Sequence, residues 1–168
     1  MVRTLFCGLQ EANRPARRPK GVPKQEYKKI GVLGAGLMGA GIATVSVQAG
    51  LDIVLIDRDQ AAADKGKAHI AAELDKLVKR GRMDQAKRDG LLAKVTATPD
   101  FGALKDCQLV VEAVFENRDV KAEATRQAEA TLPKEAVFAS NTSTLPITGL
   151  AEASSKPDHF IGLHFFSP

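Results

Sequence analysis

Three glycines at a fixed spacing are the first residues of this 168-residue sequence whose types indicate a specific chemistry. Gly34, Gly36 and Gly39 form a G-x-G-x-x-G string directly after an apolar run, with Leu37 and Met38 inside it. At a strand-to-helix turn, the first glycine permits the tight turn, the second lets a pyrophosphate approach the backbone, and the third allows close packing. The helix that follows offers unpaired N–H groups and a favourable dipole to phosphates. The string predicts a dinucleotide site, with a purely structural tight turn as the alternative.

An acidic residue follows the glycines at the distance typical of dinucleotide sites. Asp57 lies 21 residues after Gly36 and ends a second apolar run. A carboxylate there accepts hydrogen bonds from the adenosine ribose and repels a 2′-phosphate, so Asp57 predicts NAD over NADP as the cofactor. Arg58 argues the other way, because a neighbouring guanidinium can accommodate that phosphate.

A histidine close to the C-terminal end of the sequence could transfer protons. His164 stands between Leu163 and Phe165 in an apolar segment. An unperturbed imidazole titrates at about pH 6.5, so a histidine in a site can take up and return a proton around neutrality. A histidine among apolar residues is by default a core residue, and the residue types alone leave both interpretations open.

Short apolar runs alternate with stretches of helical periodicity, and this pattern is typical of βαβ units with buried parallel strands. Two helical stretches after the second run predict a hairpin from Gln60 to Leu92, with Asp84 as an N-cap. The expected fold class is α/β, a Rossmann doubly wound parallel sheet with a helical hairpin inserted after strand two. The expected strands are Lys29–Leu33, Asp52–Ile56, Val95–Ala97, Gln108–Val114, Ala136–Ser140 and Phe160–Phe165, and the other expected helices are Leu37–Ala49, Arg118–Thr131 and Ile147–Ala153.

Basic residues are concentrated at the N-terminal end. Residues 1–29 hold eight Lys or Arg and two Glu, whereas the remainder holds 16 basic and 18 acidic residues. The folded part is therefore slightly acidic and, with 5% aromatic residues, it is not expected to bind nucleic acid. Residues 1–28 are rich in proline and basic residues and are expected to form a linker from a missing upstream domain, with a mitochondrial presequence as the alternative.

Cysteine usage and apolar patterning indicate the setting. Cys7 and Cys107 lie a hundred residues apart without a Cys or His cluster, so we expect no metal, no disulfide framework and a cytoplasmic location. The charge-free stretch from Ile30 to Leu51 is long enough to cross a membrane, but it holds six glycines and several polar residues. We therefore expect no membrane span.

Four ordered segments together resemble one known family: Gly34–Gly39, Val110–Asn117, Ala139–Thr144 and Gly162–Pro168. They are similar to the NAD-binding domain of 3-hydroxyacyl-CoA dehydrogenases, most of all to the α-subunits of bacterial multifunctional fatty-acid oxidation enzymes. The resemblance covers residues 29–168, which are expected to be the NAD-binding Rossmann domain of a larger enzyme, without its C-terminal helical domain. It implies an NAD-dependent oxidation of L-3-hydroxyacyl-CoA to 3-oxoacyl-CoA in fatty-acid β-oxidation.

The resemblance also implies roles for single residues. His164 matches the family's base, which removes the hydroxyl proton of the substrate, and Ser143 matches a serine near the reacting oxygen. Asn141 is expected to bind substrate in the same loop, although Asn-Thr-Ser after a strand also fits a loop held by side-chain-to-backbone hydrogen bonds. Glu116 and Lys121 match residues near the nicotinamide side of the cofactor. The family's glutamate that orients the base lies further downstream than this sequence extends.

The helical hairpin matches the part of the family that holds the adenine-phosphate end of coenzyme A. Arg80 keeps a phosphate-binding charge there, whereas Glu73 replaces a serine. The resemblance implies an acyl-CoA substrate and a parent enzyme that is dimeric or complexed with a thiolase subunit. Two alternatives stay open: a related β-hydroxyacid dehydrogenase with a lysine base, and an NAD-binding module without turnover.

Overall fold

The computed structural model describes Gly21 and residues 25–166, which form a six-stranded sheet. The order is β3-β2-β1-β4-β5-β6, and all neighbouring pairs are parallel. The order reverses between β1 and β4, where open α/β sheets bind ligands beyond the carboxyl ends of their strands. The predicted Rossmann fold is confirmed. The strands are β1 Lys29–Leu33, β2 Asp52–Ile56, β3 Val95–Thr98, β4 Leu109–Glu112, β5 Val137–Ser140 and β6 Phe160–Gly162.

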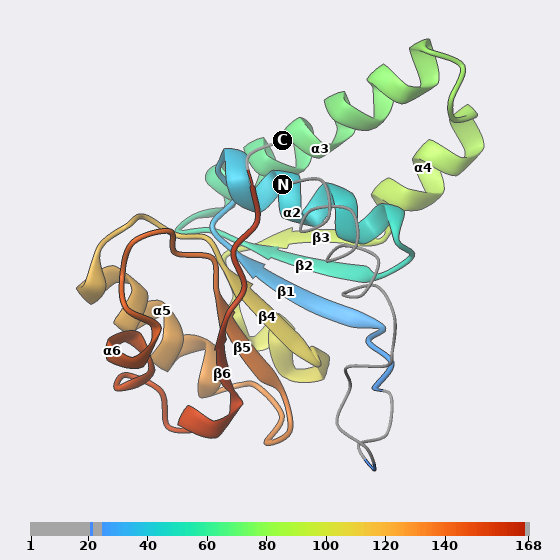
Figure 1. Cartoon of the computed structure of the whole chain (residues 1–168). Helices are drawn as coiled ribbons and strands as arrows, with labels where there is room; N and C mark the ends of the chain where they lie inside the picture. Colours follow the sequence, from blue (N-terminus) through green and yellow to red (C-terminus); the bar gives the residue numbers. More distant parts are fainter. Residues whose placement is uncertain (1–20, 22–24, 167–168) are drawn as a thin grey trace, which may run out of the picture.

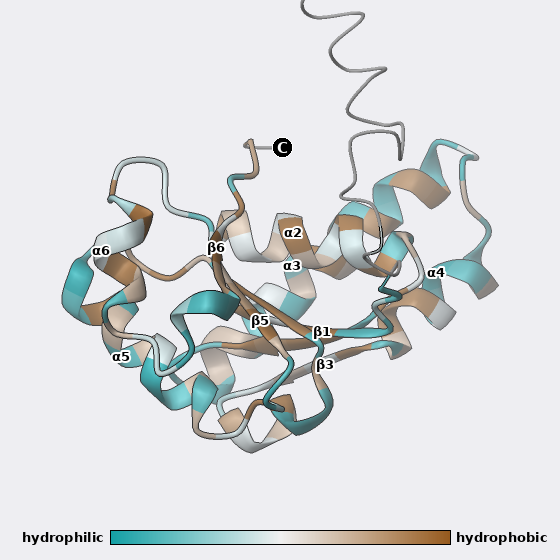
Figure 2. Cartoon of the chain, turned by 60° about the horizontal axis from the view of Figure 1, so that its bottom comes forward, coloured by the Kyte–Doolittle hydropathy of each residue, from teal (hydrophilic) through white to brown (hydrophobic). Residues whose placement is uncertain are grey.

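Helices cover both faces of the sheet (Figure 1). One face packs against α2 (Leu37–Gln48), α3 (Gln60–Lys79) and α4 (Gln85–Ala93), and the other against α5 (Arg118–Glu129) and the 3-10 helix η3 (Phe101–Asp106). Each face has its own apolar core, and the central parts of β1 and β5 are accordingly brown in Figure 2. The first core includes Ile30, Val32, Ile42, Val47, Leu55, Ile70 and Leu74, and the second includes Leu33, Val54, Ile56, Leu104, Val110, Ala128 and Phe138.

The predicted hairpin follows β2 and extends away from the sheet (Figure 1). The carboxylates of Asp59 and Asp84 cap the starts of α3 and α4 by accepting backbone N–H groups. The turn between the helices contains Gly81 at φ 65°, a conformation that glycine adopts without strain. Arg88 on α4 donates to Asp75 on α3 at 2.8 Å and joins the two helices.

Strand β4 is shorter than predicted, because it ends at Glu112 instead of Val114. The N–H of Val114 donates to the carboxylate of Glu112 at 2.8 Å, so it does not continue the ladder to a neighbouring strand. The prediction of a strand up to Val114 was therefore wrong at its end, and a side chain of the strand itself is the cause.

Strand β6 also ends early, at Gly162 instead of Phe165. The N–H of Phe165 donates to the side-chain oxygen of Asn141 at 2.7 Å, in place of a strand carbonyl. His164 therefore lies in an irregular segment beyond β6 and not on the strand, which corrects its predicted position. The 3-10 helices η3 and η4 (Pro157–His159) were not predicted, and β5 connects through α6 (Ile147–Ala151) and η4 to β6.

Most of the predicted linker over residues 1–28 lies outside the described residues. At its described end, the N–H of Lys28 donates to the side-chain oxygen of Gln108 at 2.6 Å, and the Gln108 amide donates to the carbonyl of Glu26 at 2.9 Å. These bonds tie the segment before β1 to the start of β4. Within the described part of the chain, no helix has the length and apolar character needed to cross a membrane.

Candidate functional site

The glycine string forms the turn between β1 and α2, and the protein itself requires two of its glycines. Gly34 has φ 90°, and a Cβ there would lie 2.6 Å from the carbonyl oxygen of Ala113. A Cβ on Gly39 would lie 1.7 Å from the carbonyl oxygen of Gly34. The first and third glycines therefore serve the tight turn and the close packing of α2 on β1.

Gly36 differs from these two, because no contact within the protein requires a glycine there. Its φ of −68° and ψ of −171° suit any residue, and a Cβ would meet no atom within 4 Å. Gly36 is the exposed N-cap of α2, and no side chain accepts a hydrogen bond from the helix start. In the first turn Leu37 is exposed, Met38 is half-buried, and no residue is acidic. Open space beside free N–H groups fits the diphosphate of NAD.

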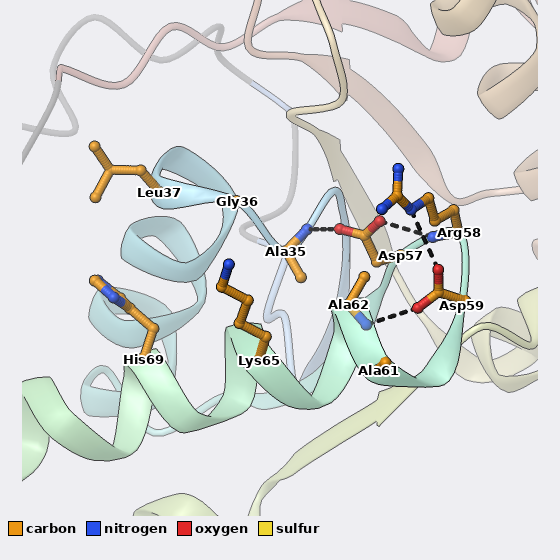
Figure 3. A pocket seen from close by; sticks show the side chains of 10 residues that line it. All are labelled: Ala35, Gly36, Leu37, Asp57, Arg58, Asp59, Ala61, Ala62, Lys65 and His69. Atoms are coloured by element: carbon orange, nitrogen blue, oxygen red, sulfur yellow. Dashed lines mark hydrogen bonds and ion pairs between the residues drawn. The ribbon is translucent and has the colours of Figure 1, made fainter.

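Asp57 lies at the carboxyl end of β2 and faces the glycine turn. Its carboxylate accepts the N–H of Ala35 at 2.6 Å and that of Arg58 at 2.7 Å. An ionised carboxylate offers about four acceptor positions, so half-buried Asp57 keeps acceptors for ribose hydroxyls. The Arg58 guanidinium pairs with Asp59 at 3.2 Å (Figure 3). This contact uses only Nε of an exposed side chain, so the preference for NAD depends on the Asp57 carboxylate and not on Arg58.

Two cavities border the turn and share Gly36, Asp57 and Arg58. The smaller, of about 630 Å³, lies between the start of α2 and α3, where Lys65 points towards the turn and His69 lies further along α3 (Figure 3). The larger, of about 1020 Å³, lies beyond the carboxyl ends of β1, β2 and β4. Its mostly apolar walls suit a flat ring system. They include Ile56, Phe101, Ala113, Val114, Phe115, Val120 and Gln127.

Ser143 and His164 lie 21 residues apart in the sequence and meet beyond the ends of β5 and β6. The hydroxyl Oγ of Ser143 is 3.0 Å from Nε2 of His164, and both residues are exposed. Asn141 is 9% exposed, and its Oδ1 holds the N–H of Phe165, next to His164 in the chain. The arrangement presents a hydroxyl and an imidazole side by side to any bound substrate.

Glu116 and Lys121 lie next to that pair and form an ion pair of 3.1 Å. Lys121 is 2% exposed and also contacts Glu112 at 2.8 Å, so it lies beneath the surface. The Glu116 carboxylate accepts from the hydroxyls of Thr142 and Thr144 in the β5–α6 loop. Burial alone would raise the pKa of Glu116, but hydrogen bonds from Thr142 and Lys121 outweigh it and lower the pKa to about 2. Glu116 is therefore ionised at neutral pH.

Arg80 lies apart from these residues. It is exposed at the C-terminal end of α3, which is the outer end of the hairpin in Figure 1. Glu73, which stands where the family has a serine, pairs with Lys76 at 2.6 Å. The hydrogen bond from Lys76 lowers the pKa of Glu73. The structure thus does not bring Arg80 together with the Ser143 loop.

Three residues of the site were not predicted from the sequence: Glu112, Thr142 and Thr144. Glu112 is 1% exposed and ends the apolar run of β4. The sequence did contain a signal for Glu112: a carboxylate within an apolar run will be buried, and a buried charge needs a partner. The threonines gave no such signal, since Asn-Thr-Ser-Thr is equally typical of an exposed loop. No group of three or more possible metal ligands occurs among the described residues.

Comparisons with known proteins agree on one family. A family model described as "3-hydroxyacyl-CoA dehydrogenase, NAD binding domain" matches residues 29–168. A probable 3-hydroxybutyryl-CoA dehydrogenase of Deinococcus radiodurans is 44% identical over 140 residues, which are 83% of this chain and 50% of that protein. A fatty acid oxidation complex subunit alpha of Shewanella baltica is 38% identical over 168 residues, which are 99% of this chain and 24% of that subunit.

A solved structure shows the same architecture. The crystal structure of (S)-3-hydroxybutyryl-CoA dehydrogenase from Ralstonia eutropha matches with a TM-score of 0.82 and 38% identity, over 85% of this chain and 50% of that one. The chain thus spans about half the length of the Deinococcus relative and about a quarter of the Shewanella subunit.

Proposed function

This chain belongs to the 3-hydroxyacyl-CoA dehydrogenase family, whose NAD-binding domain it forms, and we propose that it supplies the cofactor half of an enzyme oxidising L-3-hydroxyacyl-CoA to 3-oxoacyl-CoA. The observation that carries the proposal is the 3.0 Å contact between Ser143 and His164 at the sheet edge that also holds the glycine turn. A base beside a dinucleotide site is the arrangement that alcohol oxidation with NAD requires.

The proposed roles of the two residues follow from their hydrogen-bonding capacity. Nε2 of His164 takes the proton of the 3-hydroxyl group as the C3–H bond breaks and the carbonyl forms. NAD, when bound, accepts the hydride that leaves C3. The Ser143 hydroxyl has one proton and two lone pairs, so it can donate to the forming carbonyl oxygen while it accepts from the protonated imidazole. Asn141 holds the backbone beside His164 through Phe165.

Other residues are proposed to hold the two larger ligands. Gly34, Gly36, Gly39 and Asp57 would hold NAD, with Leu37 and Met38 offering N–H groups at the start of α2. Glu116 would lie on its nicotinamide side, with the buried ammonium of Lys121 behind it. Arg80 would attract the phosphates of coenzyme A, and Lys65 on the same helix adds positive charge beside the smaller cavity.

Assembly and location are also proposals. One relative is named a subunit of a fatty acid oxidation complex, which supports a multi-subunit assembly for the whole enzyme. A dimer, or a complex with a thiolase subunit, is what the family resemblance adds to this proposal. A cytoplasmic location stays a proposal from the cysteine usage of the sequence, and the unpaired, buried thiol of Cys107 is compatible with it.

A chimera tests the proposed reaction. Residues 29–168 replace the matching segment of the Deinococcus radiodurans relative, and NADH formation from L-3-hydroxybutyryl-CoA is followed by absorbance. We expect turnover, and we expect His164→Ala to lower kcat by about 100-fold or more without changing the affinity for NADH. His159→Ala is the matched control, because His159 lies in η4 before β6, whereas the imidazole that meets Ser143 is that of His164.

The alternatives predict different outcomes in the same chimera. An unchanged rate in His164→Ala would refute the assignment of the base and favour a dehydrogenase with a lysine base. A folded chimera that binds NADH without turnover would favour a binding module.

A further inference from the structure

A buried carboxylate at the end of β4 is connected to the Ser143 loop by a continuous series of polar contacts. Glu112 is 1% exposed and lies between two apolar cores. Its Oε1 accepts from the ammonium of Lys121 and from the N–H of Val114, both at 2.8 Å, and its Oε2 accepts from the hydroxyl of Ser140 at 2.7 Å. The carboxylate thus joins the end of β4, helix α5 and the end of β5.

Lys121 carries these contacts towards the surface. At 2% exposure its ammonium cannot reach solvent, and its three protons face Glu112, Glu116 and the carbonyl oxygen of Val114. All donors of Lys121 therefore have acceptors within the protein. Any influence of Lys121 on a bound ligand has to pass through Glu116, the outer member of the series.

Glu116 reaches the loop that presents the reactive hydroxyl. Its Oε2 faces Lys121, while its Oε1 accepts from the hydroxyls of Thr142 and Thr144. These two threonines flank Ser143 on either side, and Thr142 also accepts the N–H of Leu145 at 3.1 Å. Glu116 therefore holds the loop at both neighbours of the residue whose hydroxyl meets His164.

We propose that Glu112 is a positioning residue that, through Lys121 and Glu116, orients Ser143 against His164. The proposal rests on the proposed function of that pair. A buried ion pair is weak support for stability, because well-packed apolar residues can replace one without loss. Here the pair contributes geometry, because Glu112 holds Lys121, Lys121 holds Glu116, and Glu116 holds the Ser143 loop. A small displacement of a positioned group is enough to slow a reaction severely.

The first test removes the buried pair as a neutral unit. Glu112→Gln alone removes the fully buried partner of Lys121, leaves its ammonium with only the half-exposed carboxylate of Glu116, and lowers the Tm. Glu112→Gln with Lys121→Met should regain most of that loss. The measured quantity is the NMR chemical shift of His164 Nε2 in the 168-residue chain. Ser143→Ala removes the hydroxyl that meets His164 and gives the reference shift for the lost contact. We expect the double variant to move towards the Ser143→Ala value even where its Tm recovers.

The matched control removes an ion pair far from the site. Asp75→Asn with Arg88→Met deletes the 2.8 Å bridge of the hairpin, and it should leave the His164 shift unchanged. If the double variant at Glu112 and Lys121 also keeps the original shift, the pair is purely structural and the proposal is overturned.

A second variant keeps the test decisive if the buried double variant does not fold. Thr142→Val with Thr144→Val cuts the same series at its outer end and leaves the buried pair in place. We expect the His164 shift to move towards the Ser143→Ala value, and kcat in the active chimera to fall by about tenfold or more with little change in KM. An unchanged shift overturns the proposal. The NMR measurement needs no substrate, so its failure is distinct from an absence of dehydrogenase activity.

Discussion

One added methyl group at Gly36 or at Gly39 separates the two tasks of the glycine turn. In Gly39→Ala the new Cβ would lie 1.7 Å from the carbonyl oxygen of Gly34, whereas in Gly36→Ala it would meet no atom within 4 Å. We therefore expect Gly39→Ala to destabilise the fold. Gly36→Ala should leave the fold intact and obstruct the approach of the NAD diphosphate.

The geometry sets the size of the first effect. The clash at Gly39 is with backbone, which no side-chain rotation relieves, so its cost lies at the upper end of the range for overpacking, about 3 kcal/mol. For a domain of this size that corresponds to a fall in Tm of roughly 6–12 °C. Alanine is a poorer N-cap than glycine but restricts the unfolded chain, so Gly36→Ala should change the Tm by less than about 3 °C.

The second effect is a loss of affinity. At the proposed site a diphosphate oxygen would accept charge-assisted hydrogen bonds at the start of α2, each contributing about 1.5–3 kcal/mol. Losing one of them raises the Kd for NADH by roughly 10- to 150-fold. Isothermal titration calorimetry of the 168-residue chain measures the Kd, and thermal unfolding measures the Tm.

Gly90→Ala is the control for the Kd, because Gly90 lies in α4 with open space around its Cβ position. In the unfolding measurement it should raise the Tm slightly, since alanine is favoured over glycine inside a helix. A Gly36→Ala chain that binds NADH as tightly as the unaltered chain would refute the diphosphate assignment. An unchanged Tm in Gly39→Ala would refute the packing argument.

Two further predictions concern single carboxylates. Asp57→Ser should raise the Kd for NADH by about tenfold and lower the Kd for NADPH, because it removes ribose acceptors and the charge that repels a 2′-phosphate; calorimetry with both cofactors checks this, and an intact preference for NADH would contradict it. The folded-state pKa of Glu116, about 2, lies below its ordinary value of 4.5, so the unfolded chain binds more protons between these values. The stability that Glu116 contributes is complete above about pH 4.5 and is lost as the pH falls towards about 2. In Glu116→Gln the free energy of unfolding, measured by circular dichroism, should therefore fall less between about pH 4.5 and pH 2 than in the unaltered chain. An equal fall in both chains would disprove the lowered pKa of Glu116.

Apolar periodicity predicted the sheet well, because it reports which faces of each element are buried. All six strands and the hairpin occur where the runs and helical stretches indicated. The errors at the ends of β4 and β6 share one cause. In both places a side chain, Glu112 or Asn141, takes a backbone N–H that would otherwise continue the ladder.

For the site as well, the residues placed by nearby sequence were predictable, whereas those brought together by the fold were not. The glycine turn and Asp57 were predictable, because a strand-to-helix turn and the strand beside it are encoded by nearby residues with restricted backbone and charge requirements. The residue types of the Ser143 loop suit a solvated surface equally well, so its role came from a family resemblance.

The sequence by itself therefore determined the Rossmann fold, the NAD turn and the position of the carboxylate at the end of β2. Only the tertiary structure decided that Ser143 meets His164 and that Glu112 is buried with Lys121. The physical reason is that these contacts join β4, α5, β5 and the segment after β6, which come together only when the parallel strands align their carboxyl ends at one edge.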